Sequence, residues 1–259
     1  MAGPPEILVT NDDGIESSGI RALVEELSSV GSVTVVAPAD NQSAVGRASS
    51  REVRVQETDL GYAIEGTPVD CVVAGIGSLA PYPDVVVAGI NKGANLGMYV
   101  LGRSGTVSAA VEAAFFDVPA IATSLYLPDE MWKRQLKQSD YEHAATATRH
   151  LVEESLGSGV FEDADYLNLN APDPDMVPDG MRVTRPSRAY DMTAERDGTW
   201  VSLKDRMWQR METRSLSDGP ETDRRAVVEG HVSVSALTAP HTPEGQGSLE
   251  TVVSRYQSE

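Results

Sequence analysis

Cysteine, lysine and aromatic residues are scarce in this chain of 259 residues. The single cysteine, Cys71, excludes an internal disulfide framework and a cysteine-rich zinc site. No apolar run approaches the roughly 20 residues needed to cross a bilayer. The first residues, Met-Ala-Gly-Pro-Pro-Glu, lack the basic start and apolar core of a signal peptide. We therefore expect a cytoplasmic protein that makes no contact with membranes.

Negative charge dominates the sequence, because 39 acidic side chains outnumber 21 basic ones and give a formal net charge of −18. Such a surface repels phosphate backbones and anionic lipids, which excludes polymeric nucleic acid and membranes as partners. A small anionic substrate remains compatible with this charge where a cation or a helix N-terminus reverses the field locally. The lysines are only Lys92, Lys133, Lys137 and Lys204. Abundant carboxylates with few lysines indicate adaptation to high salt; the alternative is a protein that is merely acidic.

Short apolar strands alternate with amphipathic helices in the first half of the chain. Strands are predicted over residues 7–10, 33–37, 85–90 and 120–123, and helices after Ser17 and from Ser104. Residues 69–76 fit a helix or a strand, and their alanine and cysteine favour a helix. Apolar strands separated by helices are typical of a parallel sheet that is covered on both faces. We therefore expect a three-layer, doubly wound α/β sandwich. In such folds ligands bind beyond the carboxyl ends of the strands.

The second half is less regular. A helix is expected over residues 141–154, a strand over 163–170, β-rich excursions over 182–211, a polar mobile loop over 214–225 and a half-buried strand over 231–237. No internal repeat or long linker separates these segments. We therefore expect a single domain over residues 1–259, with a core over approximately 5–130 and a C-terminal part over 131–259 that carries the β-rich excursion.

Four polar segments follow predicted strands or open a predicted helix: Asn11-Asp12-Asp13-Gly14, Ala37 to Ser43, Ala88 to Gly97, and Arg103-Ser104-Gly105-Thr106. Adjacent carboxylates at a strand end are costly unless solvent or a cation compensates them, although an ordinary turn is the alternative. The free N–H groups at a helix start suit a phosphate, although a simple Ser or Thr cap is the alternative. Oxygen ligands favour Mg²⁺, Mn²⁺ or Ca²⁺. A hard cation beside a phosphate site indicates phosphoryl chemistry.

In their order these motifs resemble the SurE family of survival proteins. The matching stretches run from Ile7 to Gly14 with Gly19-Ile20, Val36-Ala37-Pro38 with Asn41-Gln42-Ser43, Gly66 to Cys71, Pro83 to Asn91, Gly93 with Asn95-Leu96-Gly97, and Ser104 to Val107. Weaker similarities lie in Leu167 to Pro172, Thr222-Asp223 to Gly230, and Val232-Ser233-Val234. The resemblance thus spans nearly the whole chain.

The resemblance implies a Rossmann-like core and a metal-dependent phosphatase that hydrolyses nucleoside 5′-monophosphates, with 3′-monophosphates as further candidates. It implies one divalent cation per subunit, Mg²⁺ or Mn²⁺. The implied metal ligands are Asp12, Asp13, Ser43 and Asn91, with the two aspartates as catalytic residues; the implied phosphate contacts are Asn95, Ser104, Gly105 and Thr106. Homodimers or homotetramers are also implied, and the β-rich second half is the expected assembly surface. The sequence departs from the family at Arg103, Met98 and Tyr99, which bears on substrate preference.

Other functions and residues stay open at this point. The same site could serve a polyphosphate-cleaving enzyme, a general phosphomonoesterase, or a nucleotide-binding regulator without turnover. His143 and His150 are expected to be solvated, and Cys71 to be a small buried residue rather than a nucleophile. Trp132, Trp200 and Trp208 are expected to anchor packing.

Overall fold

A computed structural model describes residues 3–239. Its main sheet has the strand order β3-β4-β2-β1-β5-β6-β7-β11-β8, and a separate two-stranded ribbon pairs β10 with β9. The strands are β1 (Glu6–Thr10), β2 (Ser32–Pro38), β3 (Val55–Glu57), β4 (Tyr62–Ile64), β5 (Val85–Lys92), β6 (Ala120–Leu125), β7 (Tyr166–Ala171), β8 (Met181–Val183), β9 (Met192–Asp197), β10 (Trp200–Asp205) and β11 (Val232–Leu237). From β4 to β7 every neighbouring pair is parallel.

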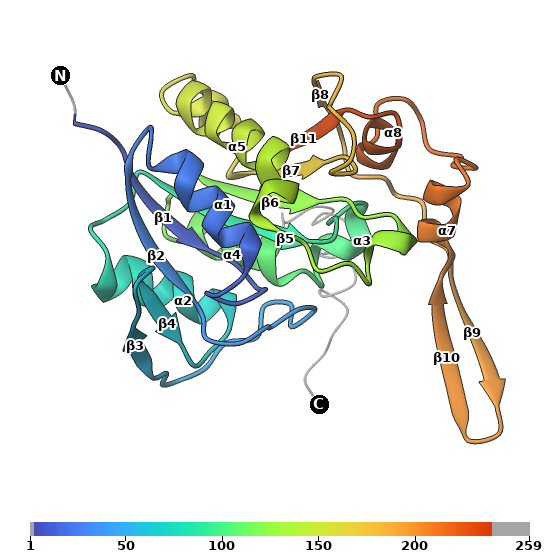
Figure 1. The fold of residues 1–259 in the computed structure, drawn as a ribbon, viewed down its shortest axis with the longest axis horizontal. Helices are drawn as coiled ribbons and strands as arrows, with labels where there is room; N and C mark the ends of the chain where they lie inside the picture. The colour runs from blue at the N-terminus through green and yellow to red at the C-terminus, as the bar shows by residue number, and fades with distance from the viewer. Residues whose placement is uncertain (1–2, 240–259) are drawn as a thin grey trace, which may run out of the picture.

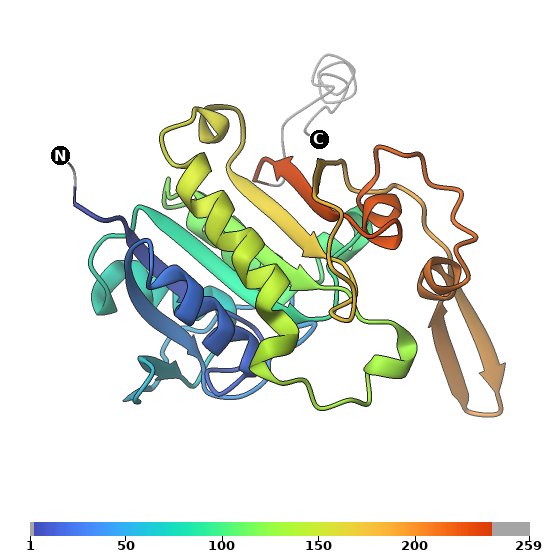
Figure 2. The same cartoon turned by 45° about the horizontal axis from the view of Figure 1, so that its top comes forward.

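Helices cover both faces of this sheet (Figure 1). They are α1 (Ser18–Leu27), α2 (Pro68–Ala74), α3 (Met98–Leu101), α4 (Gly105–Ala114), α5 (Glu142–Ser155), α6 (Val160–Asp163), α7 (Arg206–Glu212) and α8 (Asp223–Val228), with short turns η1 (Gly75–Leu79), η2 (Asp129–Met131) and η3 (Gln138–Tyr141). Figure 2 shows α1 and α5 side by side on one face, while α2 contacts α4 on the other. The expected α/β sandwich with a mostly parallel sheet is therefore confirmed.

Alternation along the strands builds a core on each face. In β1, Ile7 and Val9 belong to the cluster under α1 and α5, whereas Leu8 belongs to the cluster under α2 and α4. All three side chains are buried. Because both faces are covered, the strand is apolar throughout, which is why its sequence reads as a continuous run.

The N-termini of the main helices are capped as the sequence suggests. Ser17 caps α1 and Ser104 caps α4, since each hydroxyl accepts a backbone N–H three residues on. In α2, the Thr67 hydroxyl accepts the Asp70 N–H at 3.2 Å, and the Asp70 carboxylate accepts the Thr67 N–H at 2.8 Å. This capping box satisfies donors that a helix start leaves unpaired.

The second half differs from its expected structure at three places. The strand expected from residue 163 begins at Tyr166, because the chain first forms α6. Residues 206–211, expected to be β-rich, belong to α7, whose Met207 and Met211 lie one turn apart and are buried. The expected mobile loop over 214–225 ends in α8 and contains the fully buried Arg224. Interactions between distant residues decide these three segments.

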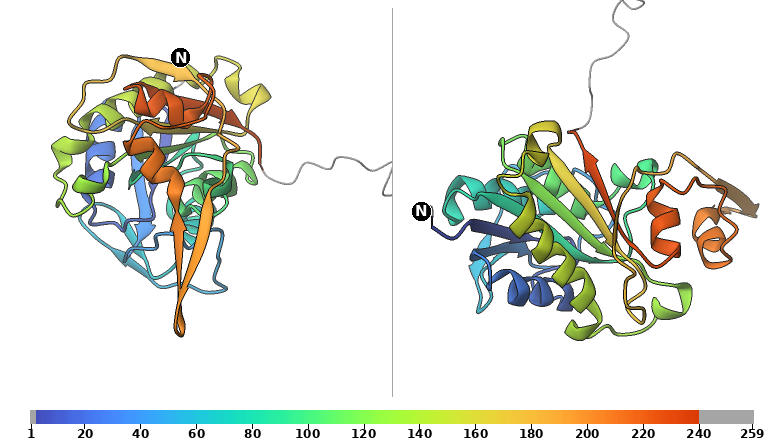
Figure 3. Two further views of the ribbon diagram at one scale, coloured as in Figure 1. Left: turned by 90° about the vertical axis from the view of Figure 1, so that its right-hand side faces the viewer. Right: turned by 90° about the horizontal axis from the view of Figure 1, so that it is seen from above.

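The cysteine and tryptophan expectations have mixed outcomes. Cys71 is fully buried in α2, and burial raises the pKa of its thiol, so the expected inert role is confirmed. Trp132 is 46% exposed and Trp200 is 80% exposed. Trp200 lies in the β9–β10 hairpin, which projects from the main sheet (Figure 3). The packing role predicted for Trp200 is therefore wrong within this chain. Among residues 3–239, no helix is both long and apolar enough to cross a membrane.

The α2 cap yields a stability prediction. The Thr67 hydroxyl accepts from Asp70 and also donates to the Ala48 carbonyl at 2.7 Å. Thr67→Ala removes both hydrogen bonds and should lower the free energy of unfolding by about 1–2 kcal/mol. Thr67→Ser keeps the hydroxyl and is the matched control. Denaturant unfolding at high KCl measures both; an equal loss in the serine variant would contradict the assignment.

Candidate active site

The candidate site lies at the carboxyl ends of β1, β2 and β5, beside the start of α4. Asn11, the first residue after β1, is buried and stabilises the turn itself. Its amide donates to the Gly14 carbonyl at 2.9 Å and to the Ser17 hydroxyl at 2.8 Å, and its oxygen accepts the Gly14 N–H. The turn interpretation thus holds for Asn11. The carboxylates of the next two residues, Asp12 and Asp13, take no part in these hydrogen bonds.

Asp12 is 3% exposed, and a neighbouring helix holds its side chain in place. The Thr106 hydroxyl donates to Asp12 Oδ1 at 2.5 Å. A Cβ at position 105 would lie 2.7 Å from Asp12 Cβ and 2.8 Å from Oδ2, so only glycine admits this approach. Burial, with a smaller contribution from the Asp13 charge, raises the pKa of Asp12 to about 6. Such a carboxylate is costly to keep ionised without a cation.

Asp13 is held from two other loops. The Lys92 N–H, at the end of β5, donates to Asp13 Oδ2 at 2.7 Å. The Asn41 amide, in the loop after β2, donates to Oδ1 at 3.3 Å. Burial raises the pKa of Asp13, while the Lys92 hydrogen bond and charge act in the opposite direction.

Ser43 and Asn91 are sequence neighbours of residues that anchor the two aspartates, since Ser43 follows Gln42 and Asn91 precedes Lys92. The Gln42 N–H donates to the Asp12 carbonyl at 2.7 Å, which ties the loop after β2 to the site. Ser43 is exposed. Asn91 is half-buried at the end of β5, where the pairing with β6 shifts register after Ala88. The Asn91 amide donates to the Gly93 carbonyl at 2.5 Å.

The start of α4 offers backbone donors and one hydroxyl. The Ser104 hydroxyl accepts the Val107 N–H at 3.1 Å as the helix cap, and its own proton can still be donated. The Thr106 hydroxyl instead donates to Asp12. Helix geometry leaves the first N–H groups, those of Gly105 and Thr106, without intrahelical acceptors. These backbone N–H groups and the Ser104 hydroxyl would bind an anion at this helix start.

Asn95 is buried and faces into the fold. Its amide donates to the Ser124 hydroxyl at 2.9 Å, and its N–H donates to Asn170 Oδ1 at 2.8 Å. Its carbonyl accepts from the amides of Asn168 and Asn170. The two β7 asparagines therefore hold the backbone of Asn95. A phosphate contact from Asn95 stays a prediction.

The donor set fits a hard divalent cation. In the described part of the chain, no three His, Cys, Asp or Glu side chains gather as a metal site. Two carboxylates completed by neutral oxygens are the remaining possibility, and such ligands suit Mg²⁺ or Mn²⁺. Asp12 Oδ2 lies beside Gly105, and the Thr106 hydroxyl binds the other carboxylate oxygen, Oδ1. Oδ2 is therefore the oxygen that would face a cation.

Sequence reasoning missed several groups that hold the loops around this site. Those groups are the Lys92 N–H, the β7 asparagines, and the buried neighbours Asp223 and Arg224, which contact the loop after β5. A backbone donor leaves no trace in side-chain chemistry. The asparagines and Asp223 do stand within the weaker family motifs, but their roles depend on contacts between distant segments.

Comparisons with known proteins agree with the sequence motifs. The family model described as Survival protein SurE matches residues 7–193. A protein from Halobacterium salinarum named 5′-nucleotidase SurE is 60% identical over 256 residues, covering 98% of this chain and 99% of that protein. One of the same name from Haloarcula marismortui is 57% identical, covering 98% and 96%. These relatives come from halophilic archaea, consistent with the acidic composition.

The fold has a counterpart among solved structures. The crystal structure of the SurE protein from Aquifex aeolicus superposes with a TM-score of 0.77 at 32% identity. The superposition covers 96% of this chain and 98% of that one. With family motif, full-length relatives and fold in agreement, the chain belongs to the SurE family.

Proposed function

We propose that this chain is a phosphomonoesterase that hydrolyses nucleoside 5′-monophosphates, with 3′-monophosphates as further candidates, using one bound Mg²⁺ or Mn²⁺. The observation that carries the proposal is the hydrogen-bonded convergence of three strand ends and one helix start on Asp12 and Asp13. Relatives named 5′-nucleotidase SurE, at up to 60% identity over nearly the full length, support the substrate class.

The residues of this chain divide the work as follows. Asp12, Asp13, Ser43 and Asn91 would hold the cation, which when bound supplies a polarised phosphate oxygen and a water of lowered pKa. The N–H groups of Gly105 and Thr106 would bind phosphate oxygens and stabilise the negative charge that develops during transfer. The Thr106 hydroxyl keeps Asp12 in place, which makes Thr106 a positioning residue as well.

A substrate and metal panel tests the proposal. Release of phosphate from 5′-AMP and 5′-GMP is measured beside 3′-AMP and polyphosphate, each with Mn²⁺, Mg²⁺ or EDTA, in high KCl. We expect hydrolysis of the monophosphates that EDTA abolishes. Preferred cleavage of polyphosphate would instead indicate the polyphosphatase. Metal-dependent nucleotide binding without phosphate release would indicate the regulator.

Asp13→Asn tests the paired carboxylates. Asparagine can still accept the Lys92 N–H, so the fold should persist. Removal of one negative ligand should lower kcat by at least about 100-fold. Steady-state kinetics with saturating Mn²⁺ measures the effect, and circular dichroism verifies the fold. Full activity in this variant would remove Asp13 from the catalytic machinery.

Asp12→Asn should separate stability from metal binding. The pKa of Asp12 is about 6 in the folded metal-free protein, against 3.8 as its ordinary value. The folded state therefore binds the proton more tightly, and stability should fall as pH rises from about 4 to about 6, by up to about 3 kcal/mol. The neutral variant should avoid this loss and be the more stable protein in EDTA at pH 7.5.

Thermal unfolding in EDTA and in Mn²⁺ checks this expectation. Added Mn²⁺ should raise the Tm of the wild type, since a ligand that binds only the folded state stabilises it, but not that of the variant. Identical responses of the two proteins would contradict a metal role for Asp12.

We infer that copies of the chain associate through the β9–β10 hairpin. An isolated two-stranded ribbon is marginally stable on its own. Its Trp200, Val201 and Leu203 are 80%, 54% and 73% exposed, which is a large apolar area for so short an element. A second copy of this chain would cover it and form the homodimer or homotetramer.

The double substitution of Trp200 and Leu203 by serine tests this association. Both side chains are exposed on a ribbon that is separate from the main sheet, so the subunit fold should survive their replacement. Both also lie far from Asp12 and Asp13 in the sequence. Light scattering coupled to size exclusion in high KCl should show a smaller species than the wild type. An unchanged mass would place the interface elsewhere.

A further inference from the structure

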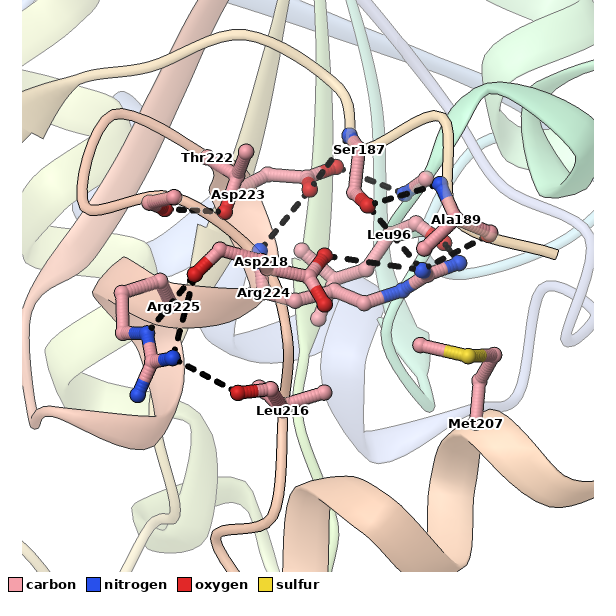
Figure 4. A network of polar contacts seen from close by, with 12 residues as sticks. Leu96, Ser187, Ala189, Met207, Leu216, Asp218, Thr222, Asp223, Arg224 and Arg225 are labelled. Atoms are coloured by element: carbon pink, nitrogen blue, oxygen red, sulfur yellow. Dashed lines mark hydrogen bonds and ion pairs between the residues drawn. The ribbon is translucent and has the colours of Figure 1, made fainter. Parts of the chain in front are cut away.

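Arg224 is the largest fully buried side chain among the described residues. It lies in the first turn of α8, and Figure 4 shows its guanidinium surrounded by oxygens. Its Nη1 donates to the Ala189 carbonyl at 3.0 Å and to the Ser187 hydroxyl at 3.2 Å, and its Nη2 donates to the Leu96 carbonyl at 3.4 Å. Asp218 forms an ion pair with it at 3.7 Å. The arginine thus joins the C-terminal part of the chain to the loop after β5.

Asp223 binds the same loop as a hydrogen-bond acceptor, whereas Arg224 binds it as a donor. Its Oδ2 accepts the Gly97 N–H at 2.6 Å, and its Oδ1 accepts the N–H groups of Ser187 at 2.9 Å and Arg224 at 2.8 Å. The Leu96 carbonyl and the Gly97 N–H belong to one peptide group. Asp223 and Arg224 therefore bind both polar atoms of that peptide and fix the orientation of its plane.

The close fit at Gly97 shows how tightly the loop is seated. Gly97 has a φ of +84°, and a Cβ there would lie 2.1 Å from Arg224 Nη2. Only a glycine provides both the backbone conformation and the space for the guanidinium. The ring of Tyr99 packs against the same group, 5.4 Å from the guanidinium carbon to the ring centre.

Such a buried charge is an expensive way to obtain stability alone. Apolar side chains of similar volume often stabilise a fold as well as a buried ion pair does. In the described chain neither Asp218 carboxylate oxygen accepts a hydrogen bond, so this pair is far from ideally satisfied. The charged groups contribute something that apolar packing cannot, namely two directional contacts to one peptide of the loop that runs from Asn95 to Ser104.

We propose that Asp223 and Arg224 are positioning residues that fix the Leu96–Gly97 peptide and so align Asn95 and the start of α4 for phosphate binding. The proposal rests on the proposed function of this site. Asn95 is one residue before the fixed peptide, and α3 leads from it to Ser104. Among the proposed metal ligands, Asp12 and Asp13 are anchored from β5, the loop after β2 and α4, and Asn91 lies within β5 itself. Metal binding should therefore be unaffected.

The test compares Arg224→Met and Arg224→Lys with Arg225→Met. Arg225 is the matched control, since it neighbours Arg224 on α8 and donates to the carbonyls of Leu216 and Asp218 but not to the loop. Lysine keeps the charge beside Asp218 yet cannot bridge the carbonyls of Leu96 and Ala189. It also serves if the methionine variant fails to fold.

Three quantities are measured: KM for 5′-AMP, the Kd of inorganic phosphate for Mn²⁺-loaded protein, and the Kd of Mn²⁺, the last two by calorimetry. For Arg224→Met we expect phosphate Kd and KM to rise at least about tenfold, with a smaller rise for lysine. The Mn²⁺ Kd should stay within about twofold for all variants, and phosphate Kd likewise for Arg225→Met.

Unchanged phosphate affinity in both Arg224 variants would overturn the proposal, as would an equal loss in Arg225→Met or a parallel loss of Mn²⁺ affinity. Failure of the proposed function is distinguishable from these outcomes. A wild type that binds phosphate but hydrolyses no monophosphate would reject the enzyme, while the phosphate-binding comparison still decides the role of Arg224.

Discussion

One buried hydrogen bond, from the Thr106 hydroxyl to the Asp12 carboxylate, joins the two halves of the candidate site. It connects the end of β1 to the start of α4, elements 94 positions apart in the sequence. Because the side chain of Asp12 lies against the bare Cα of Gly105, the carboxylate sits directly beside the first turn of α4. A parallel sheet brings its strand ends to one edge, and this contact joins the start of α4 to that edge.

The charge of the molecule sets the conditions under which that site operates. A net charge of −18 repels any phosphate that approaches from bulk solution at low ionic strength. Many arginines form ion pairs with carboxylates at the surface, as Arg21, Arg134 and Arg206 do. Attraction for a phosphate must then come from the local field of a bound cation and a helix start rather than from the surface as a whole.

The fold was largely predictable and the support of the site was not. Apolar strands such as residues 85–90 and capping serines such as Ser17 carry local signals, so these elements of the first half matched their expectation. The short strands β3 and β4 were not predicted. The β9–β10 hairpin also falls within the β-rich excursions expected over residues 182–211. Helix α7 differed from the β-rich structure expected for its residues. The buried Arg224 differed because a charged, polar segment looks solvated until distant carbonyls surround it.

The same distinction applies within the site. Residue type and position identify Asp12 and Asp13 at a strand end, and the capping serine identifies the start of α4. The structure brings these groups together. Lys92 contributes through its N–H, and Asn168 and Asn170 through contacts to the backbone of Asn95; such roles depend on three-dimensional proximity alone.

The burial of Cys71 has a practical consequence for spectroscopy. Its thiol is inaccessible and resists ionisation, so the unmodified chain presents no surface thiol to thiol-directed reagents. A cysteine engineered on the ribbon tip at Gly198 would accept a spin label or fluorophore selectively. No native cysteine therefore has to be removed before labels are introduced for distance measurements between subunits.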